Sequence, residues 1–464
     1  MEKLQKRYGL PTAICMVVGT VIGSGVFFKA QNVLTATGGN MPLGILAWII
    51  TGFLMIICSL QFAMMATKYE KVSGVVDYAE ATCGNAYAYH LAWFLVHIYY
   101  PGMTSVLAWV SARYFGVLFG WSMVGPEVLA LAGFFLILSY SMNALSPKLA
   151  GKFQVSATII KLIPIFLMAI VGTLVGLFNG TLTANFTTIV SEAVGGTSGG
   201  LFAAIVATVF AYEGWIVATS INAELNNAKR NLPLALIFGS LIVVVAYVLY
   251  YIGVAGGATN EVLINEGATT AFTNIFGGVG GTILNICIVV SCLGTLNGLM
   301  VAATRGMYAI ACRDEGPKQE MFKQIDKNTN MVTNSSIWGL LVCAAWLIYF
   351  YGANLTEGGW FGYFNFDSSE LPIITIYAFY IPIFINWMIK EKEFGFAKRF
   401  LIPSLAILSC LFMVFAAVYA HGITPFLQAK ANGAFSFPVL FYIILFAVIM
   451  VIGALLRKPK KANK

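Results

Sequence analysis

The sequence predicts an all-α membrane protein with about twelve transmembrane helices. Of its 464 residues, 59% are hydrophobic and only 10% are charged, whereas an ordinary soluble domain has roughly 25% charged residues. Several apolar runs exceed the ~20 residues that a helix needs to cross a bilayer. The 46 glycines fit the same class, because small residues let membrane helices approach one another closely.

Each expected span is an apolar run bounded by polar or charged residues. The runs cover residues 12–36, 41–66, 85–119, 124–143, 150–178, 199–225, 233–257, 278–312, 333–352, 371–390, 399–421 and 435–456. Runs longer than ~20 residues allow a helix to tilt or to extend beyond the membrane. No cleavable signal peptide is expected, because the first run is too long for one and lacks a cleavage site.

Lysine and arginine residues predict how the chain is oriented in the membrane. Of the 27 basic residues, 23 lie at the N-terminus, in every second loop or in the C-terminal tail, and the intervening loops hold mostly acids. This alternation places both termini in the cytoplasm of a multi-pass protein of the cell (inner or plasma) membrane. The four other basic residues are Lys29, Arg113, Lys161 and Lys430.

Several classes of function lack their signals in this sequence. The eight cysteines lie singly, most of them in expected spans, and are interpreted as apolar fillers rather than disulfides or metal ligands. His90 and His97 share a helix face but have no third ligand candidate nearby. No phosphate loop, nucleophile elbow or pair of catalytic carboxylates is apparent. We therefore expect no cofactor, no metal and no enzymatic activity.

A glycine-rich stretch interrupts the first span at Gly19-Thr20-Val21-Ile22-Gly23-Ser24-Gly25. Each glycine costs a helix interior about 1 kcal/mol relative to alanine, and backbone groups freed in hydrocarbon need other partners. A half-helix that begins at Gly23–Gly25 offers unpaired N–H groups and the positive end of its dipole to a carboxylate. Ser24 would add a hydroxyl. The alternative is a close helix crossing that uses Gly19 and Gly23.

The sixth span carries a second interruption, Phe210-Ala211-Tyr212-Glu213-Gly214-Trp215. If its first half-helix ends near Phe210–Ala211, the free carbonyls suit an ammonium group. Phe210 would gate the site by covering the substrate. The two interrupted helices lie five spans apart and run in opposite directions, as an inverted repeat requires. Together the two breaks predict a site for a small zwitterion.

Glu213 is costly at membrane depth if it is charged and has no partner. Three interpretations stay open. Glu213 is a proton carrier whose pKa burial has raised, or it pairs with a cation such as Lys161 or the substrate amine, or it faces an aqueous vestibule and only shapes the pocket.

Lys161 lies about 16 Å along the fifth span, close to the midplane of the membrane. It is interpreted as a fixed cation that takes the place of a transported sodium ion, as a proton carrier, or as a charge that tethers the first helix to neighbouring helices. Tyr247, in the seventh span, needs a partner for its hydroxyl. A backbone carbonyl is the expected partner rather than the substrate.

With these residues the chain resembles the amino acid–polyamine–organocation (APC) transporter superfamily, and within it the L-amino-acid transporter (LAT) branch with bacterial serine/threonine and alanine/serine/cysteine exchangers. The marks of the resemblance are the helix 1 motif 19–27, Lys161, the helix 6 motif 210–215, and two loop motifs, NAKRNLPLA at 227–235 and RGMYAIACRDEG at 305–316. The resemblance covers helices 1 to 8 clearly, and helices 9 to 12 match only in number and length.

The resemblance implies a LeuT-like APC fold: a ten-helix inverted-repeat core over residues 1–390, followed by two further helices and a basic tail over 391–464. It also implies a substrate carboxylate at Gly23, Ser24 and Gly25 and an amine at the carbonyls of the helix 6 break. The predicted substrate-binding residues are Ile22, Gly23, Ser24, Gly25, Phe210, Ala211 and Glu213, with Lys161 and Tyr247 in coupling or structural roles. Glu213 departs from many members of the family, which leaves the substrate range open.

The expected function is alternating-access transport of amino acids, as a sodium-independent exchanger of small or neutral L-amino acids. The alternative is a proton-coupled carrier of amino acids or amines that uses Lys161 or Glu213, and a more distant alternative is an amino acid receptor that transports nothing. The expected partners are the amino acid and membrane lipid, without nucleic acid. Some family members pair with a glycoprotein through a cysteine between helices 3 and 4, and this chain has none there, so no disulfide-linked subunit is expected.

Overall fold

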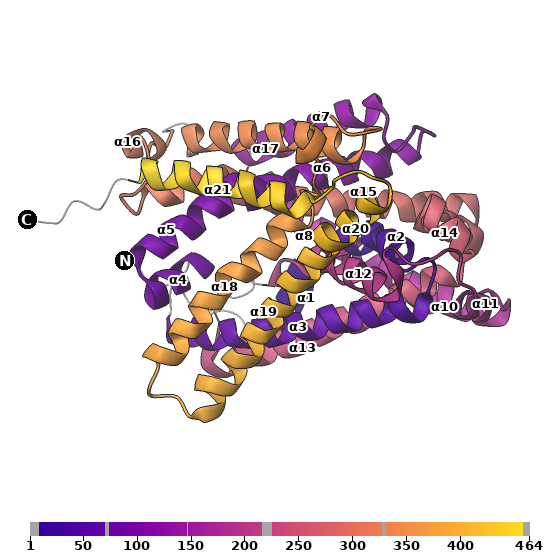
Figure 1. Ribbon diagram of the computed structural model, residues 1–464, viewed down its shortest axis with the longest axis horizontal. Coiled ribbons are helices and arrows are strands. Elements are labelled where there is room, and N and C mark those ends of the chain that lie inside the picture. Colours follow the sequence, from indigo (N-terminus) through magenta and orange to yellow (C-terminus); the bar gives the residue numbers. More distant parts are fainter. Residues whose placement is uncertain (1–8, 70–73, 146, 216–224, 327–330, 458–464) are drawn as a thin grey trace, which may run out of the picture. The chain divides into compact units, whose positions relative to one another are not determined.

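The computed structural model describes residues 9–69, 74–145, 147–215, 225–326 and 331–457, and over these ranges it is helical without any β-strand (Figure 1). Its contacts divide the chain into two compact units. The first comprises residues 1–88, 162–284 and 373–432, and the second comprises residues 89–161, 285–372 and 433–464. The predicted division at residue 390 concerns repeats rather than packing and stays a prediction.

Ten helices, some of them continuous through a short π-helical segment, are long and apolar enough to cross a membrane within the described ranges. They are α3 (Met41–Lys68), α5–η1–α6 (Asn85–Val117), α7 (Pro126–Leu145), α8–α10 (Pro147–Phe178), α13 (Ala228–Ala255), α15 (Ala268–Ala311), α17 (Thr333–Asn354), α18 (Leu371–Lys390), η5–α20 (Ala397–Ala431) and α21 (Pro438–Leu456). The two other expected spans are the interrupted ones, α1 (Leu10–Val21) with α2 (Gly25–Ala36), and α12 (Gly196–Tyr212). The predicted fold class is confirmed.

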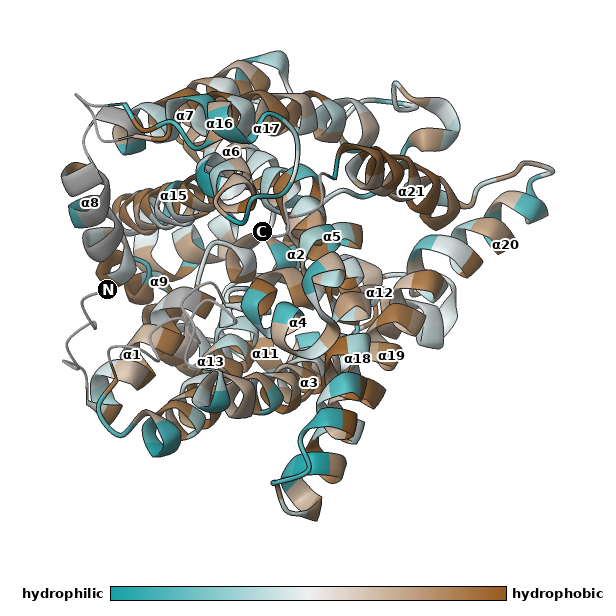
Figure 2. Cartoon of the chain, turned by 90° about the vertical axis from the view of Figure 1, so that its left-hand side faces the viewer, coloured by the Kyte–Doolittle hydropathy of each residue, from teal (hydrophilic) through white to brown (hydrophobic). Residues whose placement is uncertain are grey.

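Short helices lie in the connections between these spans. They are α4 (Val75–Cys83), α11 (Thr181–Thr187), α14 (Asn260–Glu266), α16 (Gln319–Phe322) and η4 (Gly362–Phe364). Figure 2 shows hydrophobic residues along α21 and hydrophilic residues at the connection between α18 and α19 (Ile402–Val418). This distribution is the one expected where helix sides face lipid and connections face water.

One helix start differs from the sequence-based boundaries and another agrees with them. Helix α13 begins at Ala228 rather than at residue 233, because Pro233 is accommodated inside its second turn. Within α15, two helical parts meet at a kink at Gly277 (φ 73°, ψ 172°), so the second part begins at residue 278, as predicted. The positive φ is open to glycine but strained for other residues, so the kink falls where the sequence permits it.

In the first unit, α3 packs against α13 and α12, α1 packs against α13, and α2 packs against α12. A buried asparagine pair ties together the connections at one end of these helices. The Asn260 side-chain amide donates to the carbonyls of Gly39 (2.8 Å) and Asn185 (2.9 Å), and the Asn185 amide donates to the Ala255 carbonyl (2.7 Å). Because buried backbone carbonyls need partners, this pair stabilises the arrangement of α2, α11 and α14.

At another connection of the first unit, the side chain of Glu391 accepts hydrogen bonds from Lys68 and from the Tyr69 hydroxyl. Lys68 also contacts Glu393 at 2.8 Å. The Glu391 carboxylate is nearly buried, with 6% of its side chain exposed. Two positive or polar partners offset the cost of removing this charge from water, and they join the end of α3 to the segment after α18.

In the second unit, the π-helical segment η1 (Leu95–Tyr99) orients the buried side chain of His97. Its Nδ1 lies 3.0 Å from the Trp93 carbonyl, and its Nε2 accepts a hydrogen bond from the Trp338 indole at 3.2 Å. These contacts fix one neutral tautomer, with the proton on Nδ1. The histidine thus joins η1 to α17 within the unit.

The end of α21 is held to the segment after α15 by one ion pair. The guanidinium of Arg457 contacts the carboxylate of Glu315 at 3.0 Å and lies 5.6 Å from the centre of the Tyr89 ring. The Glu315 side chain is 1% exposed, whereas that of Arg457 is 26% exposed. Removing the arginine would leave a buried carboxylate without this partner.

We expect Arg457→Ala to lower the free energy of unfolding by about 1–3 kcal/mol, which is less than a fully buried pair would lose, because Arg457 is partly exposed to solvent. Arg457→Lys keeps the charge and should retain part of the stability. Thermal unfolding of the purified protein in one detergent measures both variants. A melting temperature of the alanine variant equal to that of the wild type would contradict this account of Glu315.

Candidate functional site

The first helix breaks where the glycine motif predicts. Helix α1 ends at Val21, Ile22 is extended (φ −63°, ψ 105°), and α2 begins at Gly25. By helix geometry, the N–H groups of Gly25 and Val26 have no partner inside α2. The Ser24 hydroxyl is fully buried and has no hydrogen-bond partner among the described residues. The break therefore presents two kinds of donor at the positive end of a helix dipole.

Helix α12 ends at Tyr212, one residue beyond the predicted end near Phe210–Ala211. It continues through Tyr212, and the chain becomes extended at Glu213 (φ −64°, ψ 156°) before Gly214, whose φ is 107°. Phe210 and Ala211 consequently lie in the last helical turn, where carbonyls have no intrahelical partner. The expected continuation of this helix beyond Trp215 lies outside the described residues up to position 224.

The two breaks touch each other at Gly25. A Cβ atom built on Gly25 would lie 2.6 Å from the Cα of Ala211 and 3.1 Å from its backbone nitrogen. Both residues are buried. Only glycine fits at this distance, so a close helix crossing, which we considered at Gly19 and Gly23 as the alternative to a break, occurs at Gly25 beside the break. The start of α2 and the end of α12 are thereby brought into one place.

Tyr247 of α13 connects the two breaks. Its hydroxyl lies 2.9 Å from the Ala211 carbonyl and 3.1 Å from the Val21 carbonyl. Tyr247 is fully buried. The hydroxyl therefore satisfies backbone groups that both helix ends leave free, as expected from its membrane depth. It also occupies one lone pair of the Ala211 carbonyl.

An aromatic cluster that sequence reasoning missed surrounds Tyr247. Its ring centre lies 5.4 Å from that of Trp48 and 5.1 Å from that of Tyr212. The Tyr212 hydroxyl donates to the Trp48 carbonyl at 2.9 Å. The residues come from α3, α12 and α13, and no local pattern in the sequence links them. Such packing surrounds one side of the two breaks with large buried rings.

Glu213 directly follows the end of α12, and its carboxylate contacts the backbone of the next residue. The Gly214 N–H donates to Glu213 Oε2 at 3.3 Å, and 9% of the residue is exposed. This contact partly satisfies a carboxylate at the edge of the site. It does not decide among the three interpretations of Glu213, which stay open.

Lys161 belongs to the second unit and lies at a helix interruption of its own. Helix α8 ends at Ile160 and α9 begins at Leu162, with Lys161 between them. Pro164 explains the interruption, because it has no N–H to bond the carbonyl of Ile160. The lysine is 4% exposed. Its predicted roles in coupling or tethering stay predictions.

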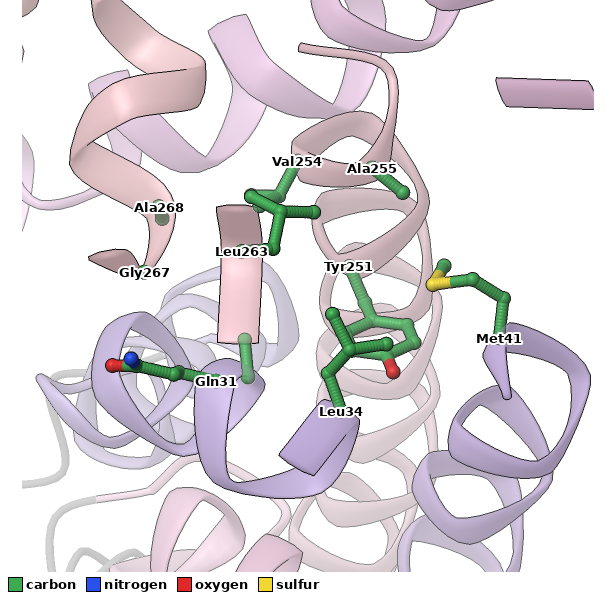
Figure 3. Close-up of a pocket in the computed structure, with 10 residues that line it drawn as sticks. Gln31, Leu34, Met41, Tyr251, Val254, Ala255, Leu263, Gly267 and Ala268 are labelled. Carbon is green, nitrogen blue, oxygen red and sulfur yellow. The ribbon is translucent and has the colours of Figure 1, made fainter. Parts of the chain in front are cut away.

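A small pocket lies farther along α2, between that helix, α13 and α14 (Figure 3). Gln31 and Leu34 line it from α2, and Tyr251 and Val254 line it from α13. The Gln31 amide donates to the Ile264 carbonyl at 2.7 Å, which holds α14 against α2. This pocket is mostly apolar and lies apart from the breaks, so its contribution is to the packing of α2.

Similarity to known proteins extends over most of the chain. The family model for amino acid permeases matches residues 8–454. The serine/threonine exchanger SteT of Bacillus subtilis is 30% identical over 400 residues, which are 85% of this chain and 86% of that protein.

More distant similarity extends to mammalian transporters. The b(0,+)-type amino acid transporter 1 of the mouse is 27% identical over 90% of this chain and 84% of its own length. The human cystine/glutamate transporter is 23% identical over 90% of this chain and 81% of its own length.

We expect Tyr247→Phe to reduce the free energy of unfolding by about 1–3 kcal/mol, because the change removes a buried hydroxyl and leaves the carbonyls of Val21 and Ala211 without it. The aromatic packing stays. Thermal unfolding in detergent tests this, with Tyr363→Phe as the matched control, since Tyr363 is 63% exposed. Equal melting temperatures for the two variants would contradict the structural role of the Tyr247 hydroxyl.

Proposed function

The chain belongs to the amino acid permease family and is an amino acid transporter rather than an enzyme, and we propose that it is a sodium-independent exchanger of small or neutral L-amino acids. The contact of Gly25 with Ala211 carries this proposal. It brings the N-terminal end of one half-helix and the C-terminal end of another to a single buried place. A zwitterion with a carboxylate and an ammonium group on one carbon matches two such ends.

The substrate carboxylate is proposed to bind the N–H groups of Gly23, Ser24 and Gly25 and the Ser24 hydroxyl, next to Ile22. Support comes from the buried, unpartnered hydroxyl of Ser24. A bound carboxylate would accept its hydrogen bond and offset the cost of its burial.

The substrate amine is proposed to bind carbonyls at the end of α12, from Phe210, Ala211 and Glu213. The Ala211 carbonyl accepts a hydrogen bond from the Tyr247 hydroxyl. Its second lone pair stays available to accept a hydrogen bond from the substrate amine. Glu213 is proposed to shape the side-chain end of the site, and Phe210 is the proposed gate. A serine/threonine exchanger among the similar proteins supports a small substrate.

Exchange is tested with the purified protein in liposomes, using labelled L-serine outside. We expect uptake to rise at least severalfold when the liposomes contain unlabelled L-serine, because the empty carrier returns slowly. Gly25→Val should abolish uptake, since a side chain there meets the Ala211 backbone.

The proton-coupled carrier would be favoured instead if uptake is the same with and without internal amino acid and disappears when a pH gradient is collapsed. Stoichiometric binding of L-serine without any flux would favour a receptor. Wild-type uptake by Gly25→Val would contradict the placement of the carboxylate.

Location and partners complete the proposal. We infer a cell-membrane protein with both termini in the cytoplasm, as the basic loops predict. We also infer that no subunit is attached by a disulfide, because residues 118–125, between α6 and α7, contain no cysteine. A shift in mass between reducing and non-reducing gels of protein from its native membrane would overturn the second inference, and protease cleavage of the C-terminal tail from outside intact cells would overturn the first.

We expect Lys161→Ala to slow transport or weaken substrate binding, because a buried cation at this helix interruption is lost. Lys152→Ala is the matched control, since Lys152 lies in α8, the helix that ends just before Lys161, and is exposed. Initial rates of L-serine exchange across a range of pH measure both. A Lys161→Ala variant that changes only the pH dependence would favour the proton-carrier role, and a variant equal to the control would exclude any coupling role.

A further inference from the structure

Lys29 is a fully buried lysine that none of the proposed binding steps uses. It lies in α2, four residues after Gly25, and its exposure is 0%. Residues four apart lie on one face of a helix. Because Gly25 faces Ala211, Lys29 lies on the face of α2 that packs against α12, one turn from the break.

The ammonium group of Lys29 lies beside two aromatic rings. Its Nζ is 5.3 Å from the centre of the Phe210 ring and 5.2 Å from the centre of the Phe28 ring. The two rings meet edge to face, with centres 5.1 Å apart. A cation this close to an aromatic ring is attracted by the electrons of its face. Three side chains from two half-helices thus form one contact group.

This contact group depends on the position of Phe210. The ring is 5% exposed and belongs to the last turn of α12, next to the carbonyls proposed for the substrate amine. If Phe210 turns away, or if α2 separates from α12, both the cation–aromatic contact and the ring–ring contact are lost. The contact group therefore stabilises one position of the ring over others.

We propose that Lys29 is a positioning residue that holds Phe210 in its closed position over the substrate site. The proposal rests on the proposed function, in which Phe210 is the gate. A desolvated cation–aromatic contact shifts an equilibrium by roughly five- to thirtyfold, so Lys29 changes how long a bound amino acid is retained.

A double-mutant cycle separates this role from general stabilisation. Lys29→Met keeps the length of the side chain and removes its charge, whereas Lys29→Arg keeps the charge. Each is made alone and together with Phe210→Leu or Phe28→Leu. Lys430→Met is the control, since Lys430 is an exposed lysine in α20 (Thr424–Ala431). The readout is the dissociation rate of labelled L-serine from the purified protein.

We expect Lys29→Met to speed dissociation of L-serine at least fivefold, and Lys29→Arg to stay within twofold of the wild type. In the Phe210→Leu background Lys29→Met should add nothing, because the ring it holds is gone. In the Phe28→Leu background it should still act. An equal effect of Lys29→Met with and without Phe210 would overturn the proposal, and so would an effect below twofold in the wild type.

A second measurement needs neither transport nor substrate. 4-Fluorophenylalanine at position 210 reports the surroundings of the ring by ¹⁹F NMR of the protein in lipid nanodiscs. We expect Lys29→Met to move or split this resonance, and Lys29→Arg and Lys430→Met to leave it in place. If Lys29→Met leaves this resonance unchanged, the proposed role of Lys29 is overturned, whatever the measured dissociation rate of L-serine. If the resonance moves but L-serine neither binds nor is carried, the proposed function fails and the positioning of Phe210 by Lys29 stands.

Discussion

The close approach of Gly25 to Ala211 is the contact on which the first unit depends. No side chain fits between these residues, and the backbone of one interrupted helix lies directly on that of the other. Breaking a helix in an apolar environment frees carbonyls and N–H groups that must find partners. The approach solves part of this problem by letting one residue, Tyr247, serve both breaks with a single hydroxyl. The Ser24 hydroxyl has no hydrogen-bond partner among the described residues, and the first N–H groups of α2 have none inside that helix, so these are the donors that the proposed carboxylate site uses.

The surroundings of this contact are organised to keep it in place. On one side, Trp48, Tyr212 and Tyr247 pack as a cluster of large rings from three helices. On the other side, Lys29 joins α2 to the end of α12 through Phe28 and Phe210. Farther along α2, Gln31 and the Asn260–Asn185 pair hold its neighbours. The two sides differ in how easily they can be released. The cluster of large rings joins three helices, whereas the contact between Lys29 and Phe210 is lost when one ring turns.

The second unit places its polar side chains differently. His97 is held between Trp93 and Trp338, and Glu315 is held by Arg457, so each of these polar groups joins two helices of the same unit. Lys161 stands at an interruption that Pro164 explains. Buried polar groups of this sort fix how two helices are aligned, because each group must meet its partner. In an apolar environment, hydrophobic contact alone distinguishes poorly between one alignment and another.

The sequence by itself determined the membrane class and closely predicted the positions of both breaks, because apolar length and glycine content are local properties of the chain. The break at Ile22–Ser24 was predicted to within a residue, and the kink at Gly277 leaves the predicted start at residue 278 in place. The end of α12 moved to Tyr212, and the start of α13 moved to Ala228 because a proline can be absorbed inside a helix. Only the tertiary structure decided that Gly25 meets Ala211, that the Tyr247 hydroxyl serves both helix ends, and that Lys29 lies beside Phe210. Most of these pairings join residues about 180 or more positions apart in the sequence. A single sequence does not show which distant helices pack against each other. The physical reason is that burial selects a residue type locally, while the partner of a buried polar group is chosen by the packing of whole helices.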